Sequence, residues 1–374
     1  MKEAEALLQS ITQDVRTLGI INGTRGGAAA LLDNPGKINS LPIGAEIKER
    51  LIRNFTWKER ERFTWQLEKG GYGYVYRDEP HYPKRLLELP DPPMGLFFEG
   101  KLSEESRPSL AVVGPRQCSQ YGFEMARYFT EELAGRGIEI ISGLAHGIDR
   151  TAHEAALKKK GRTVAVLGSG IGVPYPKENW ECYFKIRNLG GLLLSEYPPE
   201  APPLAHHFPI RNRIISGLSD AVLVVEAREK SGTLITVDAA LEQGREVFVI
   251  PGRISDKNSR GCNNLIKQGA RLVTEPEEIY EELIRKFPFY EAEREASGTD
   301  ENEEPDGLSE IEKGLASKQK MVYSLVRLDL KHVDVLINET GLNPAELLVI
   351  LSELQELGLI TEPFPNCFSR PYRG

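Results

Sequence analysis

The run LAVVGPR at residues 110–116 decides the fold class, because a short apolar strand ends directly in a turn that contains Gly and Arg. The same order of apolar run, small-residue turn and helical segment recurs along the chain, and it predicts strands at 110–113, 138–141, 163–167, 191–195, 221–225 and 247–250. Strands that are apolar on both faces and separated by crossover helices form a parallel sheet. We therefore predict an α/β fold with an extended Rossmann-like, doubly wound, mostly parallel sheet. Ligands of such sheets bind outside the carboxyl ends of the strands.

The chain divides around this core. Residues 1–75 have helical periodicity broken by Gly- and Pro-containing turns, which predicts a small all-α domain of the SAM or helix-hairpin-helix kind. We expect the core over residues 76–288 and an acidic disordered linker over 289–312. Residues 313–374 show two helical segments, a longer third segment and a short hairpin, which is the order of a winged helix. The third segment is acidic, so we expect it to contact protein rather than the major groove.

The net charge of −8 at first argues against a nucleic-acid partner. The acidity is local, however, because residues 287–374 hold 17 acidic and 8 basic side chains. Ten of those carboxylates lie between Glu291 and Glu312. The rest of the chain is close to neutral and is compatible with a basic groove.

Length and cysteine content narrow the class of protein. A chain of 374 residues predicts two or three domains. No apolar run is long enough to span a membrane, and residues 1–20 lack the order of a signal peptide, so we expect a cytoplasmic protein. Four widely separated cysteines exclude a zinc ribbon and favour a reducing compartment. Neither a metal nor a cofactor is predicted.

The turns after the first two strands favour anion binding. Gly114, Arg116 and Ser119 combine small residues, a guanidinium and the start of a helix, which suits a phosphate. A plain β–α turn with a surface Arg is the alternative. Ser142 and Gly143 form a second amide-rich turn, and the nearby His146 and Asp149 lack the partners of a catalytic triad.

The turn after the third strand adds an aromatic side chain. Gly168 and Gly170 precede Tyr175, which lies between two prolines and is followed by Lys177 and Asn179. An aromatic ring beside a cation and an amide suits a stacked base with its phosphate. Packing of Tyr175 against its own loop is an equally open interpretation.

Two further stretches carry candidate ligands. The first joins an aromatic side chain to a pair of arginines that flank an amide, and consists of Phe208, Arg211, Asn212 and Arg213. Its alternative is a helical turn whose arginines form structural ion pairs. The second opens a helix with hydroxyls and free amides, and consists of Ser231, Gly232 and Thr233.

A further strand-end turn, Ile250-Pro251-Gly252-Arg253 with Gly261–Ile266, completes the series. Five strand-end turns at one sheet edge exceed the needs of one small nucleotide and suit a line of phosphates, as on a single strand. Glu226 is the one carboxylate near a strand end that might act as an acid or base. It has no carboxylate partner, so we favour a structural role or a hydrogen bond to a ligand.

As a set, these residues resemble the DNA-processing protein A family, also called DprA or Smf. The matching motifs are Gly-x-Arg…Tyr-Gly at 114–122, Ser-Gly-x-Ala-x-Gly-Ile-Asp at 142–149, Gly-x-Gly…Tyr-Pro-x-x-Asn at 168–179, Phe-Pro-x-Arg-Asn-Arg-Ile-Ile at 208–215 and Ser-Gly-Thr-Leu at 231–234. The segment from Tyr82-Pro83 to Asp91-Pro92-Pro93 is similar to the same family. The resemblance covers residues 80–273 densely and the flanks only in architecture.

The resemblance implies a non-enzymatic protein that binds single-stranded DNA without sequence preference. It also implies a homodimer that loads the RecA recombinase onto incoming DNA in natural transformation, competence and recombination. Arg116, Lys177, Arg211 and Arg213 would then hold phosphates, and the turns at 142–143 and 231–233 would add amide and hydroxyl contacts. The family usually has Gly-Ser-Arg in the first turn, and Pro115 here removes a hydroxyl and a backbone donor.

Two other classes of protein compete with this hypothesis. Phosphoribohydrolases of the same sheet type cleave nucleoside monophosphates with a Pro-Gly-Gly-x-Gly-Thr-x-x-Glu loop. The comparable stretch at residues 231–238 lacks that Glu. A protein-interaction adaptor built around the winged helix and the linker is the third possibility.

Overall fold

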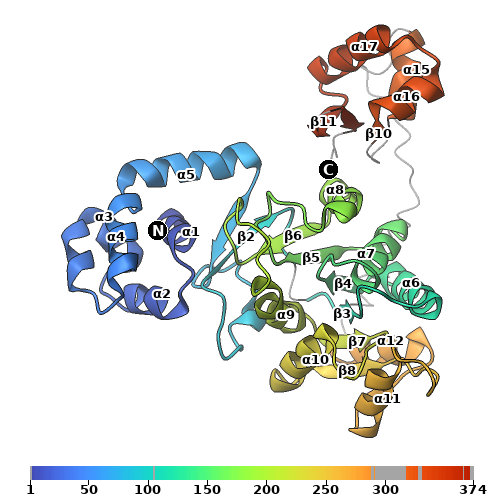
Figure 1. The fold of residues 1–374 in the computed structure, drawn as a ribbon, viewed down its shortest axis with the longest axis horizontal. Helices are drawn as coiled ribbons and strands as arrows, with labels where there is room; N and C mark the ends of the chain where they lie inside the picture. The colour runs from blue at the N-terminus through green and yellow to red at the C-terminus, as the bar shows by residue number, and fades with distance from the viewer. Residues whose placement is uncertain are drawn as a thin grey trace.

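A nine-stranded sheet organises the protein (Figure 1). The structure is a computed structural model that describes residues 2–103, 106–287, 290, 317–326, 331–364 and 366–370. The strands are β1 Gly73–Tyr76, β2 Gly95–Glu99, β3 Ser109–Val113, β4 Glu139–Ser142, β5 Thr163–Leu167, β6 Leu192–Ser195, β7 Ala221–Val224, β8 Glu246–Val249 and β9 Arg271–Leu272. Their order across the sheet is β1-β2-β6-β5-β4-β3-β7-β8-β9.

The mostly parallel, doubly wound sheet is confirmed. All six expected strands form, and β6-β5-β4-β3-β7-β8 pair in parallel. The prediction did not include β1 and β2, which extend the sheet as an antiparallel arm, or the two-residue β9. From β3 the chain winds outward to β6, then returns past β3 to form β7 and β8. The winding therefore reverses between β3 and β7.

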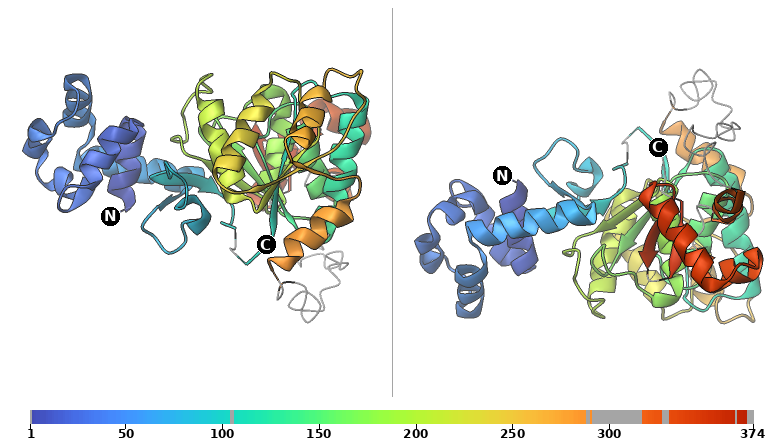
Figure 2. Two further views of the ribbon diagram at one scale, coloured as in Figure 1. Left: turned by 90° about the horizontal axis from the view of Figure 1, so that it is seen from below. Right: turned by 90° about the horizontal axis from the view of Figure 1, so that it is seen from above.

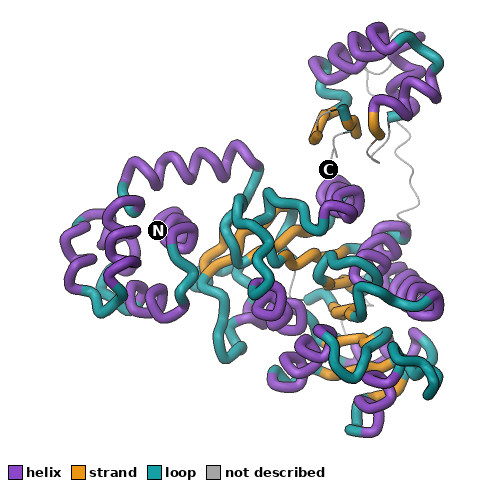
Figure 3. The backbone as a smooth tube through the Cα atoms, in the orientation of Figure 1, coloured by secondary structure: helices purple, strands orange, loops and turns teal. Residues whose placement is uncertain are grey.

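Helices cover both faces of the parallel strands (Figure 3). One face packs against α6 (Gln120–Gly135), α7 (Ile148–Lys158), α8 (Trp180–Asn188) and α12 (Pro276–Arg285). The other packs against α9 (His207–Leu218), α10 (Gly232–Glu242) and α11 (Arg260–Lys267). Each strand from β3 to β7 is buried along its whole length, which explains why apolar runs without alternation predicted them.

A helical region precedes the sheet, as expected. It comprises α1 (Lys2–Ile11), α2 (Val15–Asn22), α3 (Gly27–Asp33), α4 (Ala45–Asn54) and α5 (Trp57–Gly70). Figure 2 shows these helices beside the β1–β2 end of the sheet, with α5 running toward it. Leu8, Ile21, Leu51 and Phe55 belong to a core that continues into Phe97 of β2. The SAM-like or hairpin-like assignment and the domain boundaries remain predictions.

The C-terminal region contains α15 (Ser317–Leu325), α16 (Val333–Thr340) and α17 (Pro344–Glu356). A three-stranded sheet accompanies them, with β10 (Lys331–His332), β12 (Cys367–Ser369) and β11 (Thr361–Phe364) in that spatial order. The winged-helix assignment remains a prediction, and the expected linker at 289–312 lies almost entirely outside the described residues. Within the described ranges, no helix is long and apolar enough to cross a membrane.

Candidate nucleic-acid interface

The winding reversal between β3 and β7 is the place where a doubly wound sheet usually binds its ligand. Here the buried carboxylate of Glu226 occupies it. Glu226 accepts hydrogen bonds from the backbone N and the hydroxyl of Ser119, the N-cap of α6. Gly122 leaves the necessary room, since a Cβ there would lie 2.4 Å from Glu226 Oε2. The carboxylate of Glu226 therefore occupies the anion-binding position that we predicted at the start of α6.

A hollow of about 450 Å³ lies next to this position, over the ends of β3, β4 and β5. The turns after these strands and the first turns of α9 enclose it. Its lining residues are Arg116, Gly143, Ala145, His146, Tyr175, Pro176, Lys177, Glu178, Pro203, Phe208 and Arg211. Six of the sequence-predicted residues thus meet in one place: Arg116, Gly143, Tyr175, Lys177, Phe208 and Arg211.

Phe208 is the aromatic centre of the hollow. Its ring packs over Gly168, where a Cβ would lie 2.7 Å from the ring. The Tyr175 ring lies 5.5 Å from it, centroid to centroid. The guanidinium carbons of Arg116 and Arg211 lie 5.6 and 6.0 Å from the Phe208 centroid. Aromatic surface beside guanidinium groups suits a stacked base next to its phosphate.

Arg211 forms the floor of the hollow. It is only 4% exposed, and its Nη1 donates to Gly143 O at 2.8 Å and to Val166 O. Burial lowers the pKa of Arg211 to about 10, against the opposing charge of Asp149, so the group stays protonated at neutral pH. Gly143 admits no side chain, because a Cβ would lie 2.6 Å from Arg211 Nη2. The floor therefore carries a fixed positive charge.

Asp149 holds the turn above this floor. Its Oδ2 accepts from the backbone N of Gly143 at 3.2 Å and of Ala145 at 3.3 Å. Burial raises the pKa of Asp149, while the charge of Arg211 opposes that shift. Asp149 is thus a brace for the turn and a partial counter-charge behind it.

The rim of the hollow is exposed and cationic. Arg116 and Lys177 are both exposed there, and the floor adds Arg211. Glu178 is the rim carboxylate, and its Oε2 lies 3.4 Å from His146 Nε2. Three cations against one exposed carboxylate favour an anionic ligand.

Comparison with known proteins agrees with the resemblance in the motifs. The sequence profile described as DNA recombination-mediator protein A matches residues 73–284. The chain belongs to this family. It is 50% identical to Protein Smf of Escherichia coli over 230 residues, which is 62% of this chain and 62% of that protein's length. It is 45% identical to DNA processing protein DprA of Bacillus subtilis over 210 residues, which is 56% of this chain and 70% of that protein.

Two solved structures of the family have the same fold. DNA processing protein A of Streptococcus pneumoniae matches with a TM-score of 0.63 at 36% identity, over 76% of this chain and 98% of the other. That of Helicobacter pylori matches with a TM-score of 0.51 at 29% identity, over 57% of this chain and 96% of the other. The Helicobacter structure is described as giving insight into a single-stranded DNA binding mode.

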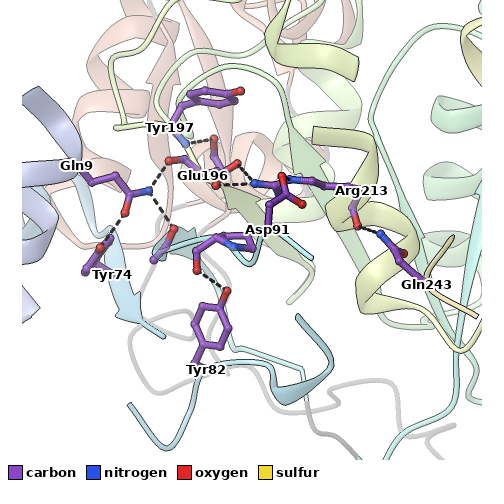
Figure 4. A network of polar contacts seen from close by, with 11 residues as sticks. Gln9, Tyr74, Tyr82, Asp91, Glu196, Tyr197, Arg213 and Gln243 are labelled. Carbon is purple, nitrogen blue, oxygen red and sulfur yellow. Dashed lines mark hydrogen bonds and ion pairs between the residues drawn. The ribbon is translucent and has the colours of Figure 1, made fainter. Parts of the chain in front are cut away.

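Arg213, a family-motif residue, does not reach the hollow. Its Nε lies 2.9 Å from Asp91 Oδ2, and its Nη2 lies 2.9 and 3.0 Å from the two oxygens of Glu196 (Figure 4). Arg213 therefore forms a structural ion pair, which is the alternative that the sequence left open for this stretch. We therefore remove Arg213 from the proposed phosphate ligands.

Several other predicted residues shape the hollow from behind. Asn179 is fully buried, and its Nδ2 donates to Leu144 O at 2.9 Å. Ser142 is also buried and donates to Val112 O at 2.7 Å. Packing explains the close glycines, because a Cβ on Gly114 would meet Ile148 and one on Gly170 would meet the carbonyls of residues 198 and 199. Ligand contact by these four residues is not supported by their positions.

The remaining predicted residues lie elsewhere on the molecule. Asn212 is half-buried in α9 and does not line the hollow. Ser231, Gly232 and Thr233 open α10 after β7, on the other side of the β3 turn. Five residues of the lining were not predicted from the sequence: His146, Glu178, Ala145, Pro176 and Pro203. Position within or beside quoted motifs could have suggested the first two.

Proposed function

We propose that the protein binds single-stranded DNA without sequence preference through the hollow around Phe208. The observation that carries this proposal is the meeting of Arg116, Lys177 and Arg211 around the Phe208 and Tyr175 rings. Cations that track a backbone and rings that stack bases are the two parts of non-specific single-strand binding. Arg116 and Lys177 are the exposed phosphate ligands, and Arg211 supplies charge from the floor.

Family membership supports a proposal about the partners and the role of the protein. We propose that the protein acts as a homodimer in the cytoplasm and loads RecA onto incoming single strands. We propose a binding protein rather than an enzyme, because the hollow is lined by cations and aromatic rings. Glu226, the acid or base of the rival hypothesis, is enclosed by bonds to Ser119.

Titration of labelled oligo-dT followed by anisotropy tests the binding proposal. Each lost phosphate contact lowers the slope of log K against log salt by about 0.7, which corresponds to about fivefold in affinity at 0.1 M salt. We expect Arg116→Ala and Lys177→Ala each to show that loss equally on every base sequence, whereas Lys159→Ala, far from the hollow, behaves as wild type. A duplex of the same length is the specificity control. Absence of oligo-dT binding at low salt would rule the proposal out.

Two further assays address the role. Release of free base from a nucleoside monophosphate, abolished by Glu226→Ala, would favour the phosphoribohydrolase alternative instead. RecA loading predicts that the protein shortens the lag in single-strand-dependent ATP hydrolysis by RecA. With the Arg116→Ala/Lys177→Ala double variant, which lacks the strand contacts, the lag should be as long as it is without the protein.

A further inference from the structure

The carboxyl edge of the sheet continues past the hollow, over β7 and β8. In the sheet, Val113 of β3 lies opposite Val224 of β7, and Val224 lies opposite Val249 of β8. The turns that follow these three strands therefore lie side by side at the carboxyl edge. The turns after β7 and β8 bear five exposed cations: Arg228, Lys230, Arg253, Lys257 and Arg260. Glu229 and Asp256 are the exposed carboxylates among them. We call the residues 228–230 and 253–260 the β7–β8 surface.

The side chains of this surface are available. Among the residues that the structure describes, none of its five cations forms an ion pair, although Arg228 donates from Nε to Asn258 Oδ1 at 2.8 Å. The nearest buried carboxylate, Glu226, already accepts bonds from Ser119. The β7–β8 surface thus presents a net positive charge that the fold itself leaves unneutralised.

Side-chain amides fix the backbone beneath these cations. Asn258 Nδ2 donates to Gln117 O at 3.1 Å and to Glu226 Oε2 at 3.4 Å, and the Asn258 carbonyl accepts from Ala227 N at 2.8 Å. One asparagine therefore ties the turns after β3, β7 and β8 together. A rigid cationic surface loses less conformational freedom when it binds than a mobile one does.

Asn263 fixes the other half of the surface. Its Nδ2 donates to Gly252 O at 3.0 Å, and its Oδ1 accepts from Gly252 N at 3.4 Å. Close packing of Gly252 on Ser259 leaves no room for a Cβ, which would lie 2.1 Å from Ser259 Oγ. The turn that carries Arg253 is therefore held in place by the hydrogen bonds of Asn263 and by packing against Ser259.

An aromatic ring lies beside these cations. Tyr121 is 42% exposed, and its hydroxyl donates to Pro251 O at 2.9 Å, so the ring is anchored by its polar end. Ile254 is 88% exposed in the same turn. Exposed rings next to cations are what an extended single strand uses for stacking.

The spacing fits a continuation of the strand in the hollow. The order β5-β4-β3-β7-β8 places four inter-strand steps between the turn of Lys177 and the turn of Arg253. At about 4.8 Å a step this is about 19 Å, and Arg116 lies halfway. One strand of B-form DNA places about six phosphates in that length, and an extended strand fewer.

We propose that the β7–β8 surface holds the phosphates of nucleotides beyond those in the hollow, so that one single strand crosses the sheet edge from Lys177 past Arg116 to Arg253. This inference rests on the proposed function and extends it, because it sets the length of strand that one protomer occupies.

Oligonucleotide length separates the two parts of the path. We compare labelled dT3, which is too short to reach from the hollow to Arg253, with dT20. Both are titrated on wild type, on Arg253→Ala/Lys257→Ala, and on the charge-matched control Lys159→Ala/Lys267→Ala, whose residues lie at the far ends of α7 and α11. Loss of two contacts should lower the salt slope for dT20 by about 1.4 and the affinity about 25-fold at 0.1 M salt. Binding of dT3 should stay within about twofold of wild type, because the hollow is intact and dT3 covers only that half of the path.

The outcomes are distinct. Equal dT20 affinity in the Arg253→Ala/Lys257→Ala variant and the control overturns the β7–β8 path while leaving the hollow intact. Failure of wild type to bind either oligonucleotide overturns the proposed function together with this path. The charge-keeping variant Arg253→Lys/Lys257→Arg should bind dT20 like wild type, which shows that charge carries the contact. Retained dT3 binding by Arg253→Ala/Lys257→Ala excludes misfolding of that variant as the cause of its loss.

Discussion

His153 is a buried imidazole whose protonation opposes folding as the pH falls. It lies in α7 and is fully buried. The Thr163 hydroxyl donates to Ile140 O at 2.9 Å, so the Thr163 oxygen is left to accept from His153 Nδ1 at 2.7 Å. The neutral Nδ1–H tautomer follows, and Nε2 is buried without a partner among the described residues. Burial, aided by the charge of Arg211, lowers the pKa of His153 to about 3.

The cost of acidification follows from these values. In the unfolded chain the imidazole titrates at its ordinary pKa of 6.5, whereas in the folded protein it stays neutral down to a pKa of about 3. The folded pKa is the lower one, so the contribution to stability is fully present above pH 6.5 and is lost as pH falls toward 3. Between pH 7.5 and 5.0, proton uptake by the unfolded state alone amounts to about 2 kcal/mol.

Urea unfolding at both pH values tests this magnitude. We expect wild type to lose about 2 kcal/mol more than His153→Gln between pH 7.5 and 5.0, because Gln has no proton to gain while all other titrating groups are shared. Proton NMR of the folded wild type supplies a check that needs no variant. The His153 Hε1 resonance should not move above pH 5. A midpoint near 6.5 for that resonance, or a difference below about 0.5 kcal/mol between the two proteins, would refute the reasoning.

Three further substitutions test the site and its supports. Gly143→Ala places a Cβ 2.6 Å from the Arg211 guanidinium, so we expect a loss of about 1–3 kcal/mol in urea unfolding and weaker oligo-dT binding. Glu196→Gln removes the half-buried carboxylate that pairs with Arg213 and leaves it only Asp91, so it should cost about 1.5–3 kcal/mol. The double variant Glu196→Gln/Arg213→Met should recover part of this loss in the same assay. Glu226→Gln removes the carboxylate at the start of α6 and should lower stability by about 1 kcal/mol, while dT3 affinity measured by anisotropy stays unchanged.

The sheet was predictable because burial on both faces imposes a simple pattern. The strands β3 and β5 consist almost wholly of apolar residues, and β4 has the apolar pair Ile140-Ile141 at its centre. Small or polar residues follow each strand where the chain leaves the sheet. The arm formed by β1 and β2 gave no such signal, since Tyr and Phe side chains there pack on the N-terminal helices and leave some of their residues half-exposed. Tertiary contacts rather than local pattern decide its existence.

The position of the site was only partly predictable. The carboxyl edge follows from topology, and Arg116, Lys177 and Phe208 were correctly placed there from their motifs. The filling of the winding reversal by Glu226 was not predictable, because it depends on the contact between residues 107 positions apart in sequence. The role of Asn179 also depends on a distant contact. A side-chain amide beside a cation can bind a ligand or, as here, donate to a backbone carbonyl, and the sequence does not distinguish the two.

The two arginines of α9 show how helix geometry divides one motif into two roles. Residues two apart lie about 200° apart around a helix, so Arg211 and Arg213 cannot face the same ligand once 207–218 is helical. Arg211 turns toward the carbonyls at the sheet edge, and Arg213 turns toward Glu196. The backbone carbonyl of Glu196 in turn accepts a hydrogen bond of 2.6 Å from Gln9 of α1 (Figure 4).

Helix α9 is therefore held from two sides, by the sheet edge through Arg211 and by the N-terminal helices through Arg213 and Glu196. Phe208 lies on the first turn of the same helix, so its place over Gly168 depends on both attachments. Arg213 thus anchors the helix that carries Phe208 without lining the hollow. That support gives a physical reason for one motif to contain both arginines.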